Sequence, residues 1–309
     1  MNSHRSILFL VLLSLSPLAR SQEEMSEKLL DRIRSGSLDY HHRLRNYDLT
    51  VTEILHAQKR GVHQKSTKRI VEDSLGQLRV EGEIEQYDEE GEVIASAETL
   101  HIYNLSKEVS SQIMTTGETN GKRNISIRKQ NSMASVIQPK SFFTAGGRPF
   151  YQLIDDLRAR QVPIYGGIVD YDEYPETLVD LTYEIRDGDG NILKHTYLIN
   201  LTGNFFPMRQ ETYFNGKRFL VLIPTPKEIS PGLFFPIKGM KVSYDTQSEE
   251  NEVSSVTNME IERVELNMNI VPKTFTFEYR NGDVITDHRN EPPTQRIYSA
   301  PTPPNGSEA

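Results

Sequence analysis

Apolar and polar residues alternate along most of this chain, and this period of two constrains the fold more than any other feature. The two cleanest segments are residues 78–87 and 179–187, where charged and hydroxyl side chains fill the parity opposite to the apolar one. Successive side chains of a strand point to opposite faces, so this pattern predicts a sheet with one dry and one wet face. The apolar residues of the two segments are Leu78, Val80, Ile84, Val179, Leu181, Tyr183 and Ile185.

Short turns separate the alternating segments. Asn120-Gly121 and Asn215-Gly216 stand between such runs, where they favour tight hairpins, and Asp187–Gly190 is a further turn. About ten to twelve strands are predicted, nearly all joined by hairpins, which excludes repeated βαβ units. A twisted sheet of this size curls or splits. The residues alone therefore leave a curled half-barrel or barrel and a β-sandwich as alternatives.

Two segments have helical rather than strand periodicity. Residues 24–45 place apolar side chains on one helical face, and Gly36 predicts a break in the middle. Residues 148–161 predict a second helix with Pro149 near its first turn, where proline is favoured. The apolar stripe of this second helix consists of Phe150, Leu153, Ile154 and Leu157.

The last part of the pattern predicts a bulge, a hairpin and a tail. Apolar residues change parity between Ile261 and Val264, which indicates a β-bulge near Arg263. Residues 271–289 predict two short strands joined at Asn281-Gly282. Residues 290–309 are rich in proline and have little to bury, so they predict a disordered Pro-rich tail.

The N-terminus has the features of an export signal. A basic start at His4 and Arg5 precedes an apolar run, residues 7–15, that is too short to span a membrane. Ala19-Arg20-Ser21 fits the small residues that signal peptidase requires. Residues 1–21 are therefore predicted to be a cleaved signal peptide, with an uncleaved anchor as the alternative.

Charge and cysteine content exclude several classes of function. The chain has a net charge of −8, and removal of residues 1–21 leaves 33 basic against 43 acidic residues, because only Arg5 and Arg20 are lost. Nucleic acids and anionic membrane surfaces favour clustered Lys and Arg, so neither is an expected partner. The chain has no cysteine, which excludes disulfides, thiolate catalysis and cysteine-bound metals.

Each sequence motif that could indicate a catalytic or metal site has a simpler structural explanation. The segment 187–191, Asp-Gly-Asp-Gly-Asn, is better explained as a turn than as a calcium loop, because an EF-hand would need Gly and Glu where Ile192 and Leu198 stand. The histidines lack zinc-enzyme spacing. The glutamates of residues 81–85 lie in a row on one strand face, as on a solvated surface. We therefore expect no enzyme, no cofactor and no metal site.

Both ends of the chain resemble a known family. A helix runs straight into the first strand over residues 29–51, and the closing segment is Asn267–Asp287. This arrangement resembles the LolA/LolB-like superfamily of outer-membrane lipoprotein-sorting carriers. The residues that match the closing motif are Ile270, Pro272, Phe275, Phe277, Gly282, Val284 and Asp287.

The resemblance implies a mainly β fold: a large curled antiparallel sheet, or incomplete β-barrel, with two helical segments packed on its concave face. It implies one such domain over residues 22–289 and a place in the periplasm of a bacterium with an outer membrane. The implied ligand is a lipid or the acyl chains of a lipoprotein, bound by a monomer without catalysis.

Two functions are the main alternatives for this sequence, and an uncharacterised hydrolase is a weaker third option. If the protein carries a lipid, Leu78, Val80, Ile84, Val179, Leu181, Tyr183 and Ile185 line or underlie the cavity, since they form the dry faces of the cleanest strands. The alternative is a structural or protein-interaction module of the cell envelope, in which the same residues are a filled core and an envelope protein is the partner. Alternation alone does not reveal the volume of a cavity.

Overall fold

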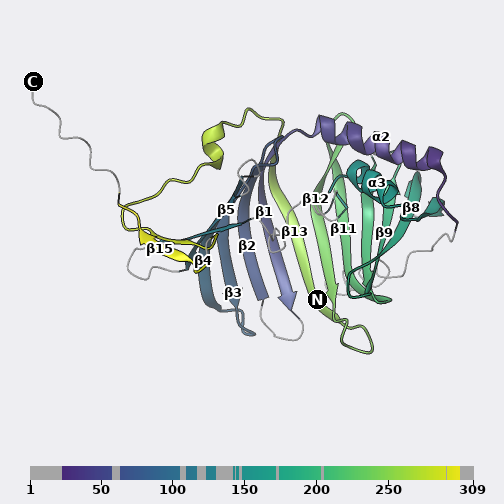
Figure 1. Ribbon diagram of the computed structural model, residues 1–309. Coiled ribbons are helices and arrows are strands. Elements are labelled where there is room, and N and C mark those ends of the chain that lie inside the picture. Colours follow the sequence, from purple (N-terminus) through teal and green to yellow (C-terminus); the bar gives the residue numbers. More distant parts are fainter. Residues whose placement is uncertain are drawn as a thin grey trace, which may run out of the picture.

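A computed structural model of the chain describes residues 23–57, 63–104, 109–116, 123–129, 142, 144–145, 148–171, 174–202, 205–289 and 291–299. These residues form one 15-stranded sheet whose terminal strands, β7 and β15, do not pair with each other. The sheet is therefore curled but open, with two helices against it (Figure 1). The expected fold class, an incomplete barrel with two helical segments, is confirmed. The predicted signal peptide and residues 300–309 lie outside the described residues.

The N-terminal part of the chain supplies one helix and six strands: α2 (Glu27–Arg43), β1 (Tyr47–Ala57), β2 (His63–Glu72), β3 (Leu78–Tyr87), β4 (Val93–Asn104), β5 (Val109–Thr116) and β6 (Asn124–Lys129). The rest supplies α3 (Phe150–Ala159), β7 (Ile164–Tyr171), β8 (Tyr174–Arg186), β9 (Ile192–Asn200), β10 (Phe206–Phe214), β11 (Lys217–Ser230), β12 (Leu233–Tyr244), β13 (Val253–Leu266), the 3₁₀ helix η3 (Pro272–Phe275), β14 (Val284–Asp287) and β15 (Thr294–Ile297).

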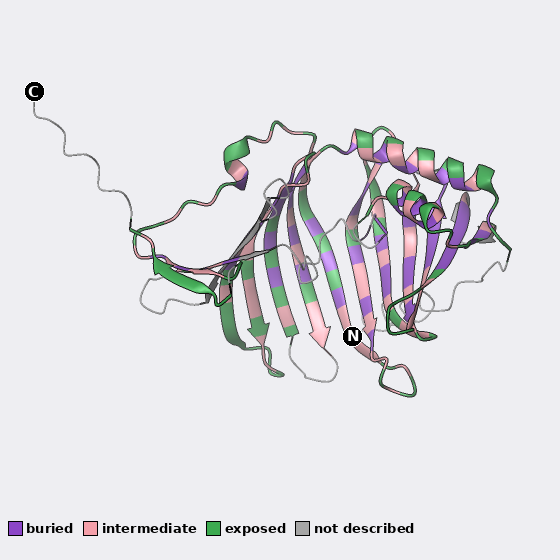
Figure 2. Ribbon diagram, viewed as in Figure 1, coloured by how far each residue is buried: buried purple, intermediate pink, exposed green. Residues whose placement is uncertain are grey.

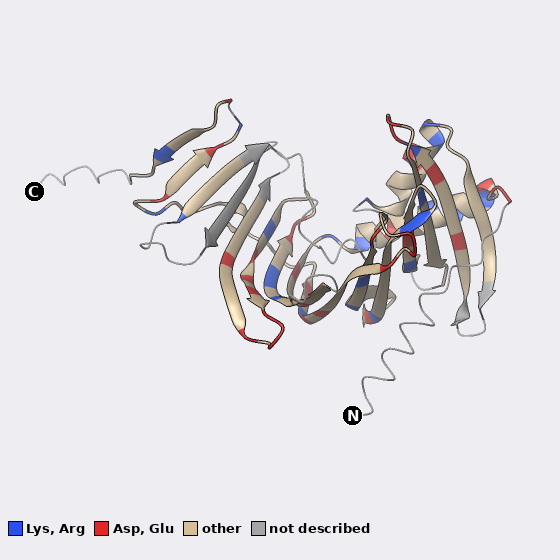
Figure 3. Ribbon diagram, turned by 90° about the horizontal axis from the view of Figure 1, so that it is seen from below, with Lys and Arg blue, Asp and Glu red and all other residues tan. Residues whose placement is uncertain are grey.

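Two meanders meet at the centre of the sheet, where β1 pairs with β13. We call β7–β13 the helix arm, and β1–β6 with β14 and β15 the strap arm. All pairs are antiparallel except β6 with β14, which is parallel. Seen from below, the two arms diverge and their outer edges stay apart (Figure 3).

Both helices pack on one face of the sheet, here called the inner face. Ile33 of α2 and Ile154 of α3 are fully buried against the helix arm, together with Val179 and Leu181 of β8. Every residue of the predicted α3 stripe is buried. Figure 2 shows buried positions on the sides of both helices that face the strands.

Gly36 does not break α2, contrary to the prediction. The helix is continuous through Gly36. Glycine is required there because a Cβ atom would lie 1.8 Å from Cδ2 and Cε2 of Phe205. The missing side chain therefore permits a close approach between the helix and an aromatic ring. The two helices are also joined by the ion pair from Arg34 Nε to Asp155 Oδ1, at 2.7 Å.

The opposite, outer face of the strap arm is covered by residues 267–283, here called the strap. Val71 and Ile102 are buried beneath Phe275 of the strap, although the neighbouring Ile70 belongs to the inner core. Adjacent residues of a strand point to opposite faces, so β2 is buried on both sides. A second cluster on this face consists of Ile125, Ile127 and Ile285, with Leu100, Phe277, Tyr279 and Tyr298 packed against it.

The predicted C-terminal hairpin is wrong. Pro272 begins η3 instead of a strand, and Phe275 and Phe277 pack across the outer face rather than along a neighbouring strand. The turn at Asn281-Gly282 exists, but it leads from the strap into β14. β14 then pairs with β15, which lies inside the segment predicted to be a tail, so the ordered chain continues to at least residue 299.

Other local predictions are confirmed. The register of β1 with β13 shifts between Thr50 and Val51, which leaves Glu262 as the extra residue of a bulge beside Arg263. Asn215 and Gly216 both have positive φ, 48° and 82°, and join β10 to β11 as predicted. Residues 187–190 form the turn between β8 and β9. Asn120-Gly121 lies outside the described residues.

Candidate binding site at the end of the helix layer

The register places all the predicted cavity residues on the inner face. Leu78 and Val80 belong to the central core below the C-terminal end of α2, while Val179, Leu181 and Tyr183 lie under the two helices. These residues are buried, with at most 5% exposure, whereas Ile84 and Ile185 are half-buried. Their role in ligand binding remains a prediction.

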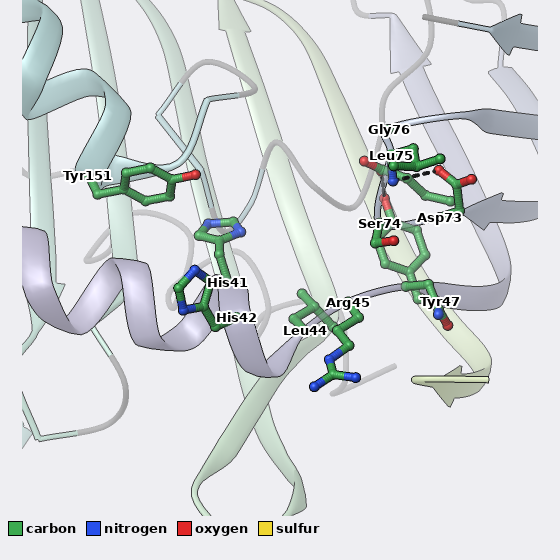
Figure 4. A pocket seen from close by; sticks show the side chains of 12 residues that line it. His41, His42, Leu44, Arg45, Tyr47, Asp73, Ser74, Leu75, Gly76 and Tyr151 are labelled. Atoms are coloured by element: carbon green, nitrogen blue, oxygen red, sulfur yellow. Dashed lines mark hydrogen bonds between the residues drawn. The ribbon is translucent and has the colours of Figure 1, made fainter. Parts of the chain in front are cut away.

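A pocket opens on this side of the sheet where α2 ends. Its volume is about 790 Å³, within the range of roughly 300–1,000 Å³ that is typical of small-molecule sites. One wall is the end of α2 with Tyr151 of α3, and the other is the turn between β2 and β3 (Figure 4). The lining residues are His41, His42, Leu44, Arg45, Asn46, Tyr47, Glu72, Asp73, Ser74, Leu75, Gly76 and Tyr151.

The base of the pocket continues into the central core. Leu44 and Tyr47 line the pocket and are also packed in the cluster that contains Leu78 and Val80. Glu72, another lining residue, is the cross-strand neighbour of Leu78. At the mouth, the side chain of Leu75 is 74% exposed. The pocket therefore shares Leu44 and Tyr47 with the core that contains the predicted inner-face residues Leu78 and Val80.

Hydrogen bonds fix the wall that α2 contributes. Asn46 donates to the Met268 carbonyl at 3.0 Å and accepts from the Met268 amide at 2.8 Å. Asn267 donates from Nδ2 to the Arg43 carbonyl at 2.8 Å, and Arg43 donates to the Pro231 carbonyl at 2.7 Å. The helix end is thereby held to the strand connections around it, and this wall is preorganised.

Both carboxylates of the pocket are engaged in local structure. Glu72 accepts a hydrogen bond from the Tyr47 hydroxyl, and burial together with this carboxylate raises the pKa of Tyr47 well above its ordinary value. Asp73 accepts from the backbone amides of Leu75 and Gln77 at 2.9 and 2.8 Å, which shapes the turn. These acids therefore serve as structural acceptors.

Aromatic contacts also shape the wall that α2 and α3 form. The His41 ring lies edge-on to Tyr40, with centroids 5.5 Å apart, and to Tyr151 of α3, at 6.0 Å. Such edge-to-face pairs are favourable because the positive ring edge meets the negative ring face. His41 and His42 both line the pocket, although side chains at adjacent positions of a helix project in different directions.

Sequence patterns did not reveal this pocket. Its residues come from a helix end and from a turn about thirty positions later, and neither has a recognisable motif. Among the described residues, no group of three or more His, Cys, Asp and Glu side chains is placed to hold a metal ion. Of the helices in the described chain, none is both long and apolar enough to cross a membrane.

No family model and no curated protein matches the chain. Solved structures that align with it include one described as an outer membrane lipoprotein-sorting protein domain from Vibrio parahaemolyticus, with 9% identity, 80% of this chain and 97% of that chain covered, and a TM-score of 0.43. A DUF1329 family protein from Desulfovibrio piger has 7% identity, coverage of 80% and 97%, and a TM-score of 0.40. LprF from Mycobacterium bovis has 11% identity, the alignment covers 81% of this chain and 98% of that chain, and the TM-score is 0.31. Identities and TM-scores this low assign neither an activity nor a ligand to the chain.

Proposed function

We propose that this protein is a non-catalytic binding protein of the bacterial cell envelope, and that it holds a lipid or the acyl chains of a lipoprotein. The observation that carries the proposal is the pocket at the end of the helix layer, whose base continues into the apolar inner face. The predicted signal peptide supports export to the periplasm of a bacterium with an outer membrane.

An acyl chain gains free energy in such a place because apolar surface leaves water, at about 0.8 kcal/mol for each buried methylene. Leu75 at the mouth and Leu44 and Tyr47 at the base provide the apolar contacts. Leu78 and Val80 are already buried, so deeper entry requires side chains of the central core to move. The pocket is therefore the entrance, and the inner face beneath it is the place for the rest of the chain.

The direct test is native mass spectrometry of protein purified from a lipid-rich host, followed by competition with a fatty acid. We expect co-purified lipid that the fatty acid displaces. Leu75→Lys should weaken fatty-acid binding several-fold, since it puts a charge at the mouth without changing the core. The matched control is Ile168→Lys, because Ile168 is 64% exposed on the edge strand β7 and does not line the pocket.

One observation favours the alternative, an interaction module with a filled core. Val179 and Leu181 are 0% exposed, and Leu78 and Val80 are 1% exposed, so the inner face is packed where the helices or the central core cover it. In that case the purified protein is free of lipid and fatty acid does not bind. This outcome would reject the carrier and leave an envelope protein as the partner.

A further inference from the structure

A group of charged and polar side chains interrupts the apolar inner face next to the predicted cavity residues. Glu53 of β1, Ser66 and Lys68 of β2, and His101 of β4 are each less than 10% exposed. The register places Lys68 opposite Val51, Ser66 opposite Glu53, and His101 opposite Val80. These side chains therefore share the face of Leu78 and Val80. His101 lies beside Val80, and the other three lie further from α2 along the strands.

Lys241 of β12 joins this group from the other side of the β1–β13 seam. Lys241 is the cross-strand neighbour of Thr257 in β13, and Glu53 is the cross-strand neighbour of Met259, two residues further along β13. Residues two apart point to the same face, so Lys241 and Glu53 are near neighbours on the inner face. Burial lowers the pKa of Lys241, and the negative charge of Glu53 opposes this effect.

The hydrogen bonds within the group are incomplete. Glu53 Oε2 accepts from Lys68 Nζ at 2.5 Å and from Ser66 Oγ at 3.3 Å. Glu53 Oε1 is buried without a hydrogen-bond partner among the described residues. Within the same part of the chain, Lys241 forms no ion pair. The Glu53 carboxylate thus pairs with Lys68 alone although Lys241 is also near it, and one of its oxygens lacks a donor.

Such an arrangement would destabilise the folded protein if this part of the core served packing alone. A buried polar atom without a partner destabilises the folded state, and so does an ammonium group that is half-buried, as that of Lys241 is, without a counter-ion. Apolar residues would fill the same positions at lower cost. A ligand that supplies an acceptor to the lysines and a donor to Glu53 would satisfy each of these groups.

We propose that the cluster of Glu53, Ser66, Lys68 and Lys241 binds the anionic head group of the ligand, a phosphate that carries a hydroxyl donor. This inference rests on the proposed function, because it assigns the head group of the same lipid whose acyl chains lie against Leu78 and Val80. Charge-assisted hydrogen bonds from ammonium groups to phosphate are among the stronger ones in proteins. Lys241 binds the phosphate, Lys68 binds both phosphate and Glu53, and Glu53 Oε1 accepts the hydroxyl.

The test compares two lipids with identical acyl chains, dipalmitoyl phosphatidic acid and dipalmitoylglycerol, by native mass spectrometry and by displacement of a fluorescent fatty acid. The wild-type protein should bind phosphatidic acid about tenfold or more tightly than the neutral lipid, as expected for one charged hydrogen bond. Lys241→Met should abolish this preference by lowering the affinity for phosphatidic acid. Lys241→Arg should retain the preference, because it keeps the charge.

The control is Lys238→Met on the same strand, since Lys238 pairs with the exposed Glu260 at 2.7 Å on the outer face. It should behave like the wild type. Equal affinity of the wild-type protein for both lipids, or an unchanged preference in Lys241→Met, would overturn the assignment of the head-group site and leave the carrier intact. Binding of neither lipid would reject the proposed function itself. Inorganic phosphate that binds alone, with loss in Lys241→Met, would show an anion site that is not a lipid site and would overturn the inference.

Discussion

The two arms of the sheet have similar alternating strands but are covered on opposite faces. In the helix arm, α2 and α3 cover the inner face, and Val179 and Leu181 of β8 are buried beneath them. In the strap arm, residues 267–283 cover the outer face, and Val71, Ile102 and Ile125 are buried there. Smaller buried clusters, such as Val221 with Val242, also occur on the outer face of the helix arm.

This difference shows how one open sheet keeps part of its inner face available. An alternating strand needs only one covered face to gain most of its burial energy. Because the strap supplies cover from outside, a helix covers the inner face of the strap arm only near the seam with the helix arm, where Leu78 and Val80 lie below the end of α2. The candidate pocket and the polar cluster lie near this boundary, where the helix layer ends.

The largest expected effect concerns the cover of the helix arm. Phe150 of α3 is 1% exposed and lies edge-on to Tyr197, with ring centroids 5.1 Å apart. Phe150→Ala should lower the free energy of unfolding by about 3–5 kcal/mol, because it leaves a large cavity under the helix. Urea denaturation followed by circular dichroism measures this loss. Phe219→Ala, at a position that is 47% exposed, should change stability by less than about 0.5 kcal/mol. Similar losses in both variants would contradict a packed helix layer.

A second prediction concerns pH and the same arm. Burial lowers the pKa of His195 from 6.5 to about 4. Between these values the unfolded chain binds the proton and the folded one does not, so stability is complete above pH 6.5 and falls as the pH approaches 4. The loss from this residue is at most about 3 kcal/mol. His195→Phe should remove this part of the pH dependence between pH 6.5 and 4 in urea denaturation, and an unchanged slope would show that His195 titrates normally.

The smallest effect tests the strap. Arg79 donates from Nη1 to the Thr274 carbonyl at 3.2 Å, and this contact joins β3 to the strap. Arg79→Ala should cost about 1 kcal/mol and speed amide hydrogen exchange in the strap and β14, while α2 and α3 stay protected. Arg263→Ala is the control, because Arg263 pairs with Glu265 on the same face without a contact to the strap. Faster exchange in the helices of Arg79→Ala would mean that the arms are not separate units.

Local periodicity predicted most of the strands and both helices: alternation indicates strands, and the spacing of apolar residues on one helical face indicates helices. It identified the dry parity of β3 and β8, and the phase change beside Arg263 located a real bulge. The strand β2 was not recognised, since its segment is rich in Lys and Arg although Lys68 is buried.

The strap could not be predicted in the same way. Phe275 and Phe277 alternate like strand residues, yet their positions are decided by tertiary contacts with β2, β4 and β6. The pairing of β14 with β6 joins segments that are far apart in sequence, and no local signal specifies it. The pocket was missed for the same reason, because its walls meet only after the sheet has curled.

Photocrosslinking of a fatty acid with a diazirine near its methyl end, followed by peptide mapping, shows directly whether the ligand lies on the inner face. We expect crosslinks to residues 41–47 and 72–80, which contain the pocket walls and the predicted residues Leu78 and Val80. Excess unlabelled fatty acid should suppress them. Crosslinks confined to the outer face, at the strap and the strand residues beneath it, or crosslinks that competition does not suppress, would contradict an inner-face binding site.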